Sequence, residues 1–189
     1  MNPPVESGIR RVTERIGYAD PENPYVTLFY DDVQWPDGRK GRYTRIVESR
    51  GVPGVAVLPI VGDQIGLILV DRYPVNRRLW EAPRGFGEGS DPEADALREL
   101  REETGWTARE MIGIGVTYLN SGLLAGEVHL YLAHVDHAVV AAELDESIRI
   151  NLFDVDEVMG MYRAGDLPDA ATQCLLLGAL SRGVLDVRA

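Results

Sequence analysis

Hydrophobic and polar positions along the chain predict a mixed α/β domain preceded by a separate β element. Residues 1–20 show little periodicity and are interrupted by proline and glycine, so we expect a loosely ordered arm. Tyr25–Val33 is rich in β-branched and aromatic residues, a Pro-Asp-Gly turn follows, and Gly41–Ser49 alternates. This succession predicts a β-hairpin that forms a small N-terminal sheet of its own.

The main domain begins near Val55, where two apolar runs are joined by Gly62-Asp63, a strong hairpin signal. The predicted strands are Val55–Val61, Gln64–Asp71, Leu79–Ala82, Arg109–Tyr118, Glu127–Val135 and Ile148–Phe153. One helix is expected to open at Asp154 with a capping box, and a last helix to span about Asp169–Arg182. Interleaved strands and helices predict an α/β fold with a mixed sheet between helices.

A further helix, between Asp91 and Gly105, gathers three glutamates on one face. Asp91 followed by proline is typical of an N-cap, and Gly105 supplies the left-handed stop. At about 100° per residue, the side chains that share one face are Glu99, Glu102 and Glu103. The adjoining apolar stripe consists of Ala96, Leu97 and Leu100.

Like charges at these spacings destabilise a helix by roughly 0.2–0.5 kcal/mol per pair. A divalent cation would remove that repulsion, and hard ions such as Mg²⁺ prefer carboxylate oxygens. The alternative is a solvated helix face on which Arg98 pairs with Glu102 at i, i+4. The spacing alone leaves both interpretations open.

The run Arg98–Trp106, RELREETGW, matches the REUxEExGU core of the Nudix box, in which U is a bulky apolar residue. A glycine-bearing loop, Gly85–Gly89, precedes it as the box requires. The chain therefore resembles the Nudix hydrolases. The resemblance implies an α/β/α sandwich with a mixed sheet, and a metal-dependent hydrolase.

The upstream half of the box departs from the family pattern. The interval from Gly85 to Arg98 is one residue short, so the slot of the first box glutamate holds Ser90 or Asp91, depending on the end from which one counts. In the family that glutamate mainly braces the loop against the box arginine. Glu88 and Asp91 are the candidate replacements.

Segments outside the box resemble the ADP-ribose pyrophosphatases, so that the likeness spans roughly residues 25–180. These segments are Gly51–Val61, Asp71–Gly85, Gly126–Ala133 and Gly165–Leu177. The resemblance implies an N-terminal arm and hairpin over residues 1–50 that serves dimerisation, and a Nudix hydrolase domain over residues 51–189. It also implies a homodimer whose subunits exchange residues 25–49.

The family's metal ligands map onto Glu99, Glu102, Glu103 and the backbone carbonyl of Arg84. We expect Mg²⁺ there, with Mn²⁺ as a possible substitute. The ions would neutralise the diphosphate and lower the pKa of the attacking water. The resemblance assigns no role to the Arg84 side chain, which reaches either phosphate or solvent.

The general base and the substrate contacts follow from the same resemblance. Glu146, on a loop before a late strand, is the expected base; Glu143 and the absence of any dedicated base are the alternatives. Arg72 corresponds to a position that contacts the diphosphate, with Arg77 and Arg78 as neighbouring candidates. Glu81 corresponds to a buried acid near the metal and the terminal ribose, or forms a structural ion pair.

Adenine needs an aromatic platform, which in the resembling dimers comes from the partner's N-terminal hairpin. Trp35 is the expected residue, and Phe29 and Tyr30 are alternatives. The three histidines lack metal-ligand spacing on one element, and we expect His129 to be packed and hydrogen-bonded rather than catalytic.

The amino-acid composition limits the kinds of molecule that the protein is expected to bind. At 189 residues, a net charge of −11 argues against a nucleic-acid polymer and against an anionic membrane surface. Cys174 is the single cysteine, so no intrachain disulfide can form and a reducing cytoplasm is expected. The N-terminus lacks the apolar core of a signal peptide, and no apolar run is long enough to cross a bilayer. We therefore expect a soluble protein acting on a small nucleoside diphosphate derivative.

The most specific expectation is Mg²⁺-dependent hydrolysis of ADP-ribose to AMP and ribose 5-phosphate. GDP-mannose or another nucleotide sugar is the alternative substrate. An alternative of another class is a ligand-binding module with the Nudix fold and little turnover, suggested by the shortened loop and the missing glutamate. Retention of Glu99, Glu102 and Glu103 argues for the enzyme.

Overall fold

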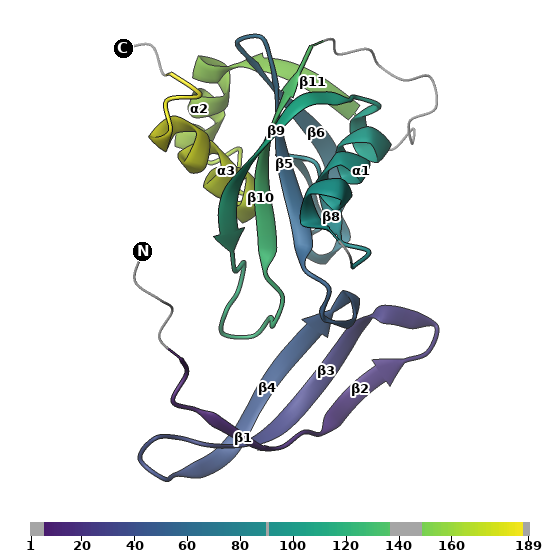
Figure 1. The fold of residues 1–189 in the computed structure, drawn as a ribbon, viewed down its shortest axis with the longest axis vertical. Coiled ribbons are helices and arrows are strands. Elements are labelled where there is room, and N and C mark those ends of the chain that lie inside the picture. Colours follow the sequence, from purple (N-terminus) through teal and green to yellow (C-terminus); the bar gives the residue numbers. More distant parts are fainter. Residues whose placement is uncertain (1–5, 90, 137–148, 187–189) are drawn as a thin grey trace. The chain divides into compact units, whose positions relative to one another are not determined.

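The computed structural model describes residues 6–89, 91–136 and 149–186, and the chain divides into two compact units (Figure 1). Residues 1–52 and 120–126 form the first unit, and residues 53–119 and 127–189 form the second. The segment 120–126 joins the first unit by backbone hydrogen bonds. Ile46 N donates to Leu123 O at 2.8 Å, and Ala125 N donates to Ile46 O at 2.9 Å.

The first unit is a four-stranded antiparallel sheet built around its longest strand, β3. The strands are β1 (Arg10–Thr13), β2 (Ile16–Asp20), β3 (Asn23–Gln34) and β4 (Lys40–Glu48). β4 pairs with β3 from Val26↔Glu48 to Gln34↔Lys40, which confirms the predicted hairpin. β1 and β2 also pair with β3, one after the other.

The expectation of a loosely ordered arm before residue 21 is therefore wrong for residues 10–20. Both short strands, Arg10–Thr13 and Ile16–Asp20, are almost entirely solvent-exposed and carry no clear apolar alternation. Their order comes from backbone pairing with β3, which lies later in the chain, and sequence periodicity does not report such pairing.

The second unit contains a seven-stranded mixed sheet. Its strands are β5 (Gly54–Val61), β6 (Gln64–Arg72), β7 (Arg77–Glu81), β8 (Arg84–Phe86), β9 (Ala108–Thr117), β10 (Val128–Val135) and β11 (Arg149–Asp154). The order is β11-β6-β5-β10-β9, and β10 runs parallel to β5. Short 3₁₀ turns occupy Ser49–Gly51 and Tyr73–Val75.

The predicted β5–β6 hairpin is confirmed, but the two strands pair only beside the turn, at Ile60↔Ile65 and Val61↔Gln64. Beyond that point they diverge, and β7 pairs with β6 while β8 pairs with β5. The segment linking β7 to β8 therefore crosses from one diverging strand to the other. It also bonds to the sheet directly, since Val57 N donates to Pro83 O at 2.9 Å.

The helices of the described residues cover the two faces of this sheet (Figure 1). They are α1 (Pro92–Thr104), α2 (Val155–Ala164) and α3 (Ala170–Ser181). Ala96 and Leu100 of α1 pack in one core cluster with Val55 and Val57. The helices α2 and α3 bury residues in a second cluster with Leu58 and neighbouring side chains. This arrangement confirms the predicted α/β/α sandwich.

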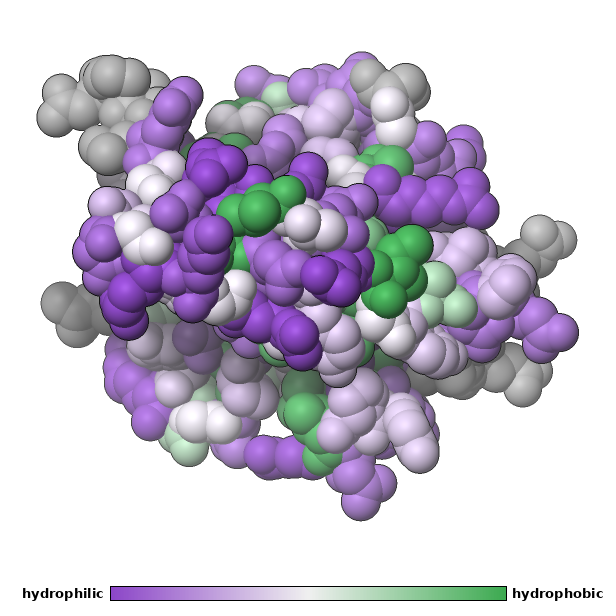
Figure 2. Space-filling view, turned by 90° about the horizontal axis from the view of Figure 1, so that it is seen from below, coloured by the Kyte–Doolittle hydropathy of each residue, from purple (hydrophilic) through white to green (hydrophobic). Residues whose placement is uncertain are grey.

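The surface follows the acidic composition. Hydrophilic side chains dominate the face seen in Figure 2, and the hydrophobic residues there form small separate patches. Within the described ranges, every helix is too short or too polar to traverse a lipid bilayer.

Candidate metal and diphosphate site

The helix α1 is fixed at both ends by the residues that the sequence indicated. Asp91 caps the N-terminus by accepting a hydrogen bond from Glu93 N at 3.0 Å. Gly105 ends the helix in the left-handed region with φ 73°, and its N–H donates to Arg101 O at 2.8 Å. The apolar residues Ala96 and Leu100 of α1 are buried in the core, and Glu99, beside them on the helix, is 9% exposed.

Strand β8 lies directly against this glutamate face at Gly85. A Cβ at position 85 would overlap the Glu99 carboxylate, so a larger residue there would displace that carboxylate. The adjacent Arg84 N–H donates to Glu103 Oε2 at 2.9 Å. The backbone of residues 84 and 85 and two of the three glutamates thus form one contact surface.

Burial raises the pKa of two of these carboxylates. It raises the pKa of Glu103 to about 7, and repulsion from Glu99 and Glu81 acts in the same direction, against the Arg84 N–H bond and Arg72. Burial also raises the pKa of Glu99, although Arg98 opposes this. Both groups are desolvated anions with too little compensating positive charge, which favours binding of a cation.

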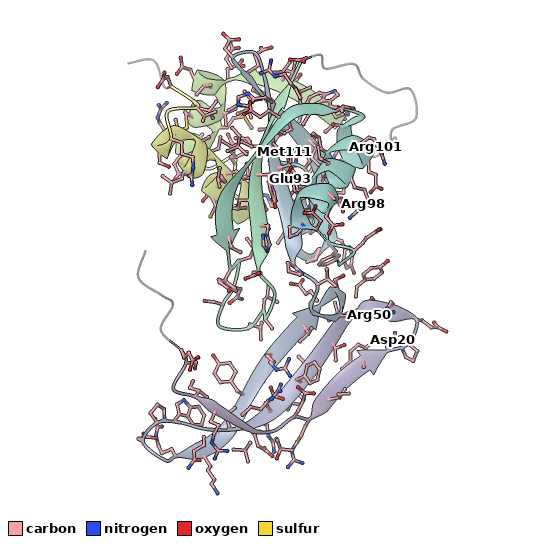
Figure 3. The ribbon with its side chains drawn as sticks, viewed as in Figure 1. Asp20, Arg50, Glu93, Arg98, Arg101 and Met111 are labelled. Carbon is pink, nitrogen blue, oxygen red and sulfur yellow. The ribbon has the colours of Figure 1, made fainter. Side chains whose placement is uncertain are left out.

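Arg98, labelled in Figure 3, contacts this face, and its two terminal nitrogens have different partners. Nη1 lies 2.8 Å from Glu99 Oε1 and 2.9 Å from Glu102 Oε2. Nη2 donates to Phe86 O at 2.9 Å and lies 3.4 Å from Asp95 Oδ1. Arg98 therefore connects the glutamate face to the loop that follows Gly85.

Asp95 is an acid of this site that the sequence analysis did not single out. It is 9% exposed, and its Oδ1 also accepts a hydrogen bond from Glu88 N at 3.0 Å. The candidate replacements for the box glutamate are placed differently: Asp91 caps α1, and the Glu88 carboxylate is 76% exposed and 3.8 Å from Arg98 Nε. The signal available in the sequence was the i, i+3 spacing of Asp95 and Arg98.

A second charged cluster surrounds Glu81, which is completely buried at the end of β7. Arg72 donates to both of its carboxylate oxygens, through Nε at 3.1 Å and through Nη2. Arg84 Nη2 lies 3.6 Å from Glu81 and 3.2 Å from Asp169, which caps α3. Glu81 thus forms the ion pair that the sequence left open, and the Arg84 side chain contacts two acids.

Within the described parts of the chain, no three His, Cys, Asp or Glu side chains already surround a possible ion. Instead, Arg98 contacts Glu99 and Glu102, and the Arg84 N–H donates to Glu103. The donor chemistry nevertheless fits a hard divalent cation, because Glu99 and Glu103 are desolvated and repel one another, and Glu102 adds a more exposed carboxylate. A bound cation would take over oxygens that Arg98 and the Arg84 N–H now occupy.

The remaining candidates lie elsewhere. Trp35 is in the first unit, where its ring fills the space left by Gly41 and Arg39 lies 5.6 Å from the ring centroid. Phe29 lies under Arg45 in the same sheet. Arg77 and Arg78 are exposed. His129 Nε2 is 3.1 Å from Glu127 Oε1, as expected for a hydrogen-bonded histidine.

The loop acids Glu143 and Glu146 lie outside the described residues. The assignments of a base, of substrate contacts and of metal ligands therefore stay predictions.

Comparison with known proteins identifies the family. The sequence model of the NUDIX domain matches residues 51–172, which include α1 and the diverging strands β5–β8. The chain belongs to the Nudix family.

Two relatives indicate where in the family it falls. The chain is 31% identical over 153 residues to an ADP-ribose pyrophosphatase of Bacillus subtilis (strain 168), covering 78% of this chain and 80% of that protein. It is 29% identical over 167 residues to a GDP-mannose pyrophosphatase of Cronobacter sakazakii (strain ATCC BAA-894), covering 82% and 87%. Among solved structures, an ADP compounds hydrolase shares the fold with a TM-score of 0.77 at 16% identity, covering 96% of both chains.

The protein is accordingly a Nudix pyrophosphohydrolase that cleaves the diphosphate linkage of a small nucleotide derivative. Nudix pyrophosphatases use a divalent metal, which agrees with the desolvated carboxylates of α1. The interval from Gly85 to Arg98, in which this Nudix box is one residue short, contains Asp95, and Asp95 contacts Arg98.

Proposed function

We propose that this Nudix enzyme hydrolyses ADP-ribose to AMP and ribose 5-phosphate with Mg²⁺. The observation that carries the proposal is the contact between the α1 glutamates and the Arg84-Gly85 backbone. Similarity to the B. subtilis ADP-ribose pyrophosphatase supports the choice of substrate.

In this proposal Glu99, Glu102, Glu103 and the Arg84 carbonyl hold the ion, and Mn²⁺ can replace Mg²⁺. When bound, the ion neutralises diphosphate charge and lowers the pKa of the attacking water. Arg72 binds a diphosphate oxygen with the partly exposed side of its guanidinium, while buried Glu81 fixes its orientation. Water then adds to one phosphorus, the bridging P–O bond breaks, and two phosphomonoesters result.

Two further roles follow from the resemblance and rest on no described contact. Glu146 accepts the proton of the attacking water, and Trp35 from a second copy stacks on adenine. The second copy is held by the N-terminal element, residues 1–50, in a homodimer. We place the enzyme in the cytoplasm, in agreement with its single cysteine.

The test is release of phosphate from a panel of nucleoside diphosphate derivatives with Mg²⁺, coupled to a phosphatase that acts only on the products. ADP-ribose should be the best substrate. Glu103→Gln should lower kcat on the order of 10³-fold or more, because the metal site loses a charged ligand. Glu93→Gln makes the same change at an exposed position of α1 and should leave the rate unchanged.

GDP-mannose is the second candidate substrate, because a GDP-mannose pyrophosphatase also matches most of the chain. If the enzyme prefers GDP-mannose in the panel, GDP-mannose replaces ADP-ribose as the proposed substrate, and the proposed catalytic site is unchanged. No product from any compound, with ligand still raising the melting temperature of the folded protein, would refute turnover and favour a binding module.

A further inference from the structure

The Arg98 guanidinium is shared between two groups of acceptors that compete for it. One group, Glu99 and Glu102, carries the oxygens assigned to the metal. The other group, Asp95 and the Phe86 carbonyl, lies on the loop side. Of these four acceptors only the Asp95 carboxylate is both charged and outside the proposed ligand set.

We propose that Asp95 is a positioning residue that holds Arg98 and the loop after Gly85 for metal binding, in place of the acid that the shortened Nudix box lacks. The inference rests on the proposed metal site and adds to it a residue outside the box pattern. One oxygen, Asp95 Oδ1, accepts from Glu88 N at 3.0 Å and lies 3.4 Å from Arg98 Nη2.

Its burial and position make Asp95 better suited than the other nearby acids to hold Arg98 and the loop. Its side chain is 12% exposed, so its bonds to the loop and to Arg98 are shielded from water. Asp91 is engaged at the helix N-cap, and the Glu88 carboxylate is mostly in solvent and beyond hydrogen-bond distance of Arg98. An acid one turn before the arginine thus braces the loop from inside the helix.

Arg98 and a bound metal ion would compete for carboxylate oxygens of the glutamate face. Arg98 and a divalent cation require the same atoms of Glu99 and Glu102. When those oxygens turn toward the cation, Asp95 and the Phe86 carbonyl remain as partners of Arg98. The guanidinium therefore stays hydrogen-bonded and in place. Without Asp95, Arg98 would hold the two glutamates more strongly and the cation would bind more weakly.

The experiment is a Mn²⁺ titration of the full-length protein, with free Mn²⁺ followed by electron paramagnetic resonance in the absence of substrate. Asp95→Ala should weaken binding about tenfold or more, the range seen when partners of metal ligands are removed. Asp95→Asn should fall between wild type and Asp95→Ala, because its amide oxygen still accepts from Glu88 N but carries no charge for Arg98.

Asp91→Asn is the matched control, since it removes a charge from the same end of α1 while asparagine still caps the helix, and it should bind Mn²⁺ like wild type. With substrate present, the Asp95 variants should regain kcat at saturating metal, whereas a loss of folded protein would lower kcat without moving the metal midpoint.

Equal Mn²⁺ affinity of wild type, the near-isosteric Asp95→Asn variant and the Asp95→Ala variant would overturn the proposal, as would an equal loss in Asp91→Asn. If Asp95→Ala does not fold, Asp95→Asn decides alone: unchanged affinity refutes the role. Because no substrate enters the binding measurement, inactivity of wild type on ADP-ribose would refute the proposed function and leave this result intact.

Discussion

At the scale of single residues, the site is a group of acids whose charges are only partly balanced. Glu81 is neutralised by Arg72 and approached by Arg84, whereas Glu103 has one backbone N–H and lies in the field of two other glutamates. Desolvation without a paired cation disfavours the charged form of a carboxylate. The metal site is therefore the place where the protein gives up stability that a bound ion restores.

This imbalance predicts how the metal-free protein responds to pH. The pKa of Glu103 is raised from 4.5 to about 7 by burial, so the folded state binds this proton more tightly than the unfolded state does. The stability contributed by this group is complete below about pH 4.5 and is lost as pH rises through about 7. In EDTA, the melting temperature of the wild type should fall as the pH rises over this interval, and the melting temperature of Glu103→Gln should fall less.

The measurement is differential scanning fluorimetry of both proteins in EDTA, since other groups titrate in the same range and only the difference reports Glu103. Glu93→Gln controls for loss of an α1 charge at an exposed position. Parallel pH curves for wild type and Glu103→Gln would contradict the assignment.

At the scale of elements, the site depends on how β5 and β6 separate after their hairpin. The split admits β7 and β8, and the β8 backbone then lies against the glutamates of α1. The sequence predicted β5, β6, β7 and α1 from apolar runs, turn residues and caps. It did not predict β8, because three residues, Arg84–Phe86, are too few to show a period and are ordered by pairing with β5.

The closeness of β8 and α1 predicts a strong effect of one methyl group. Gly85→Ala would place a Cβ on the Glu99 carboxylate, which is the far end of a flexible side chain and must turn away. Moving this proposed ligand should weaken Mn²⁺ binding measurably, whereas the free energy of unfolding should change little because no backbone atom is displaced. Calorimetry and the Mn²⁺ titration would test both effects.

Gly113→Ala is the matched control in the same sheet, because a Cβ there meets Tyr131 at 3.5 Å, an ordinary contact. It should retain wild-type Mn²⁺ affinity. Unchanged Mn²⁺ affinity of the Gly85→Ala protein would show that glycine is not required at this position of β8.

At the scale of the whole molecule, the N-terminal unit is a single sheet layer with several large apolar side chains in solvent. Ile16 is 66% exposed, Tyr18 55% and Val12 48%. Such a sheet is expected to bury an apolar face against another layer, and a second copy of the chain would supply one. This supports the proposal that residues 1–50 serve dimerisation.

The prediction is that the protein sediments as a homodimer and that a double change, Ile16→Glu with Tyr18→Glu, shifts it to monomer. Val75→Glu, which alters an equally exposed apolar residue of the second unit, should leave the dimer intact. Sedimentation velocity distinguishes the species. A monomeric wild type, or dissociation by both changes alike, would refute the assignment to the N-terminal element.

The sequence by itself determined the features that depend on local spacing: the caps of α1, its glutamate face, the β5–β6 hairpin and the family match of the box. The tertiary structure decided what depends on residues far apart in the chain. It paired residues 10–20 with β3, joined Arg72 to Glu81, and brought Asp95 and Phe86 to the two sides of Arg98. The physical reason is that periodicity reports burial along one element, whereas ion pairing and backbone pairing depend on which elements the fold brings together.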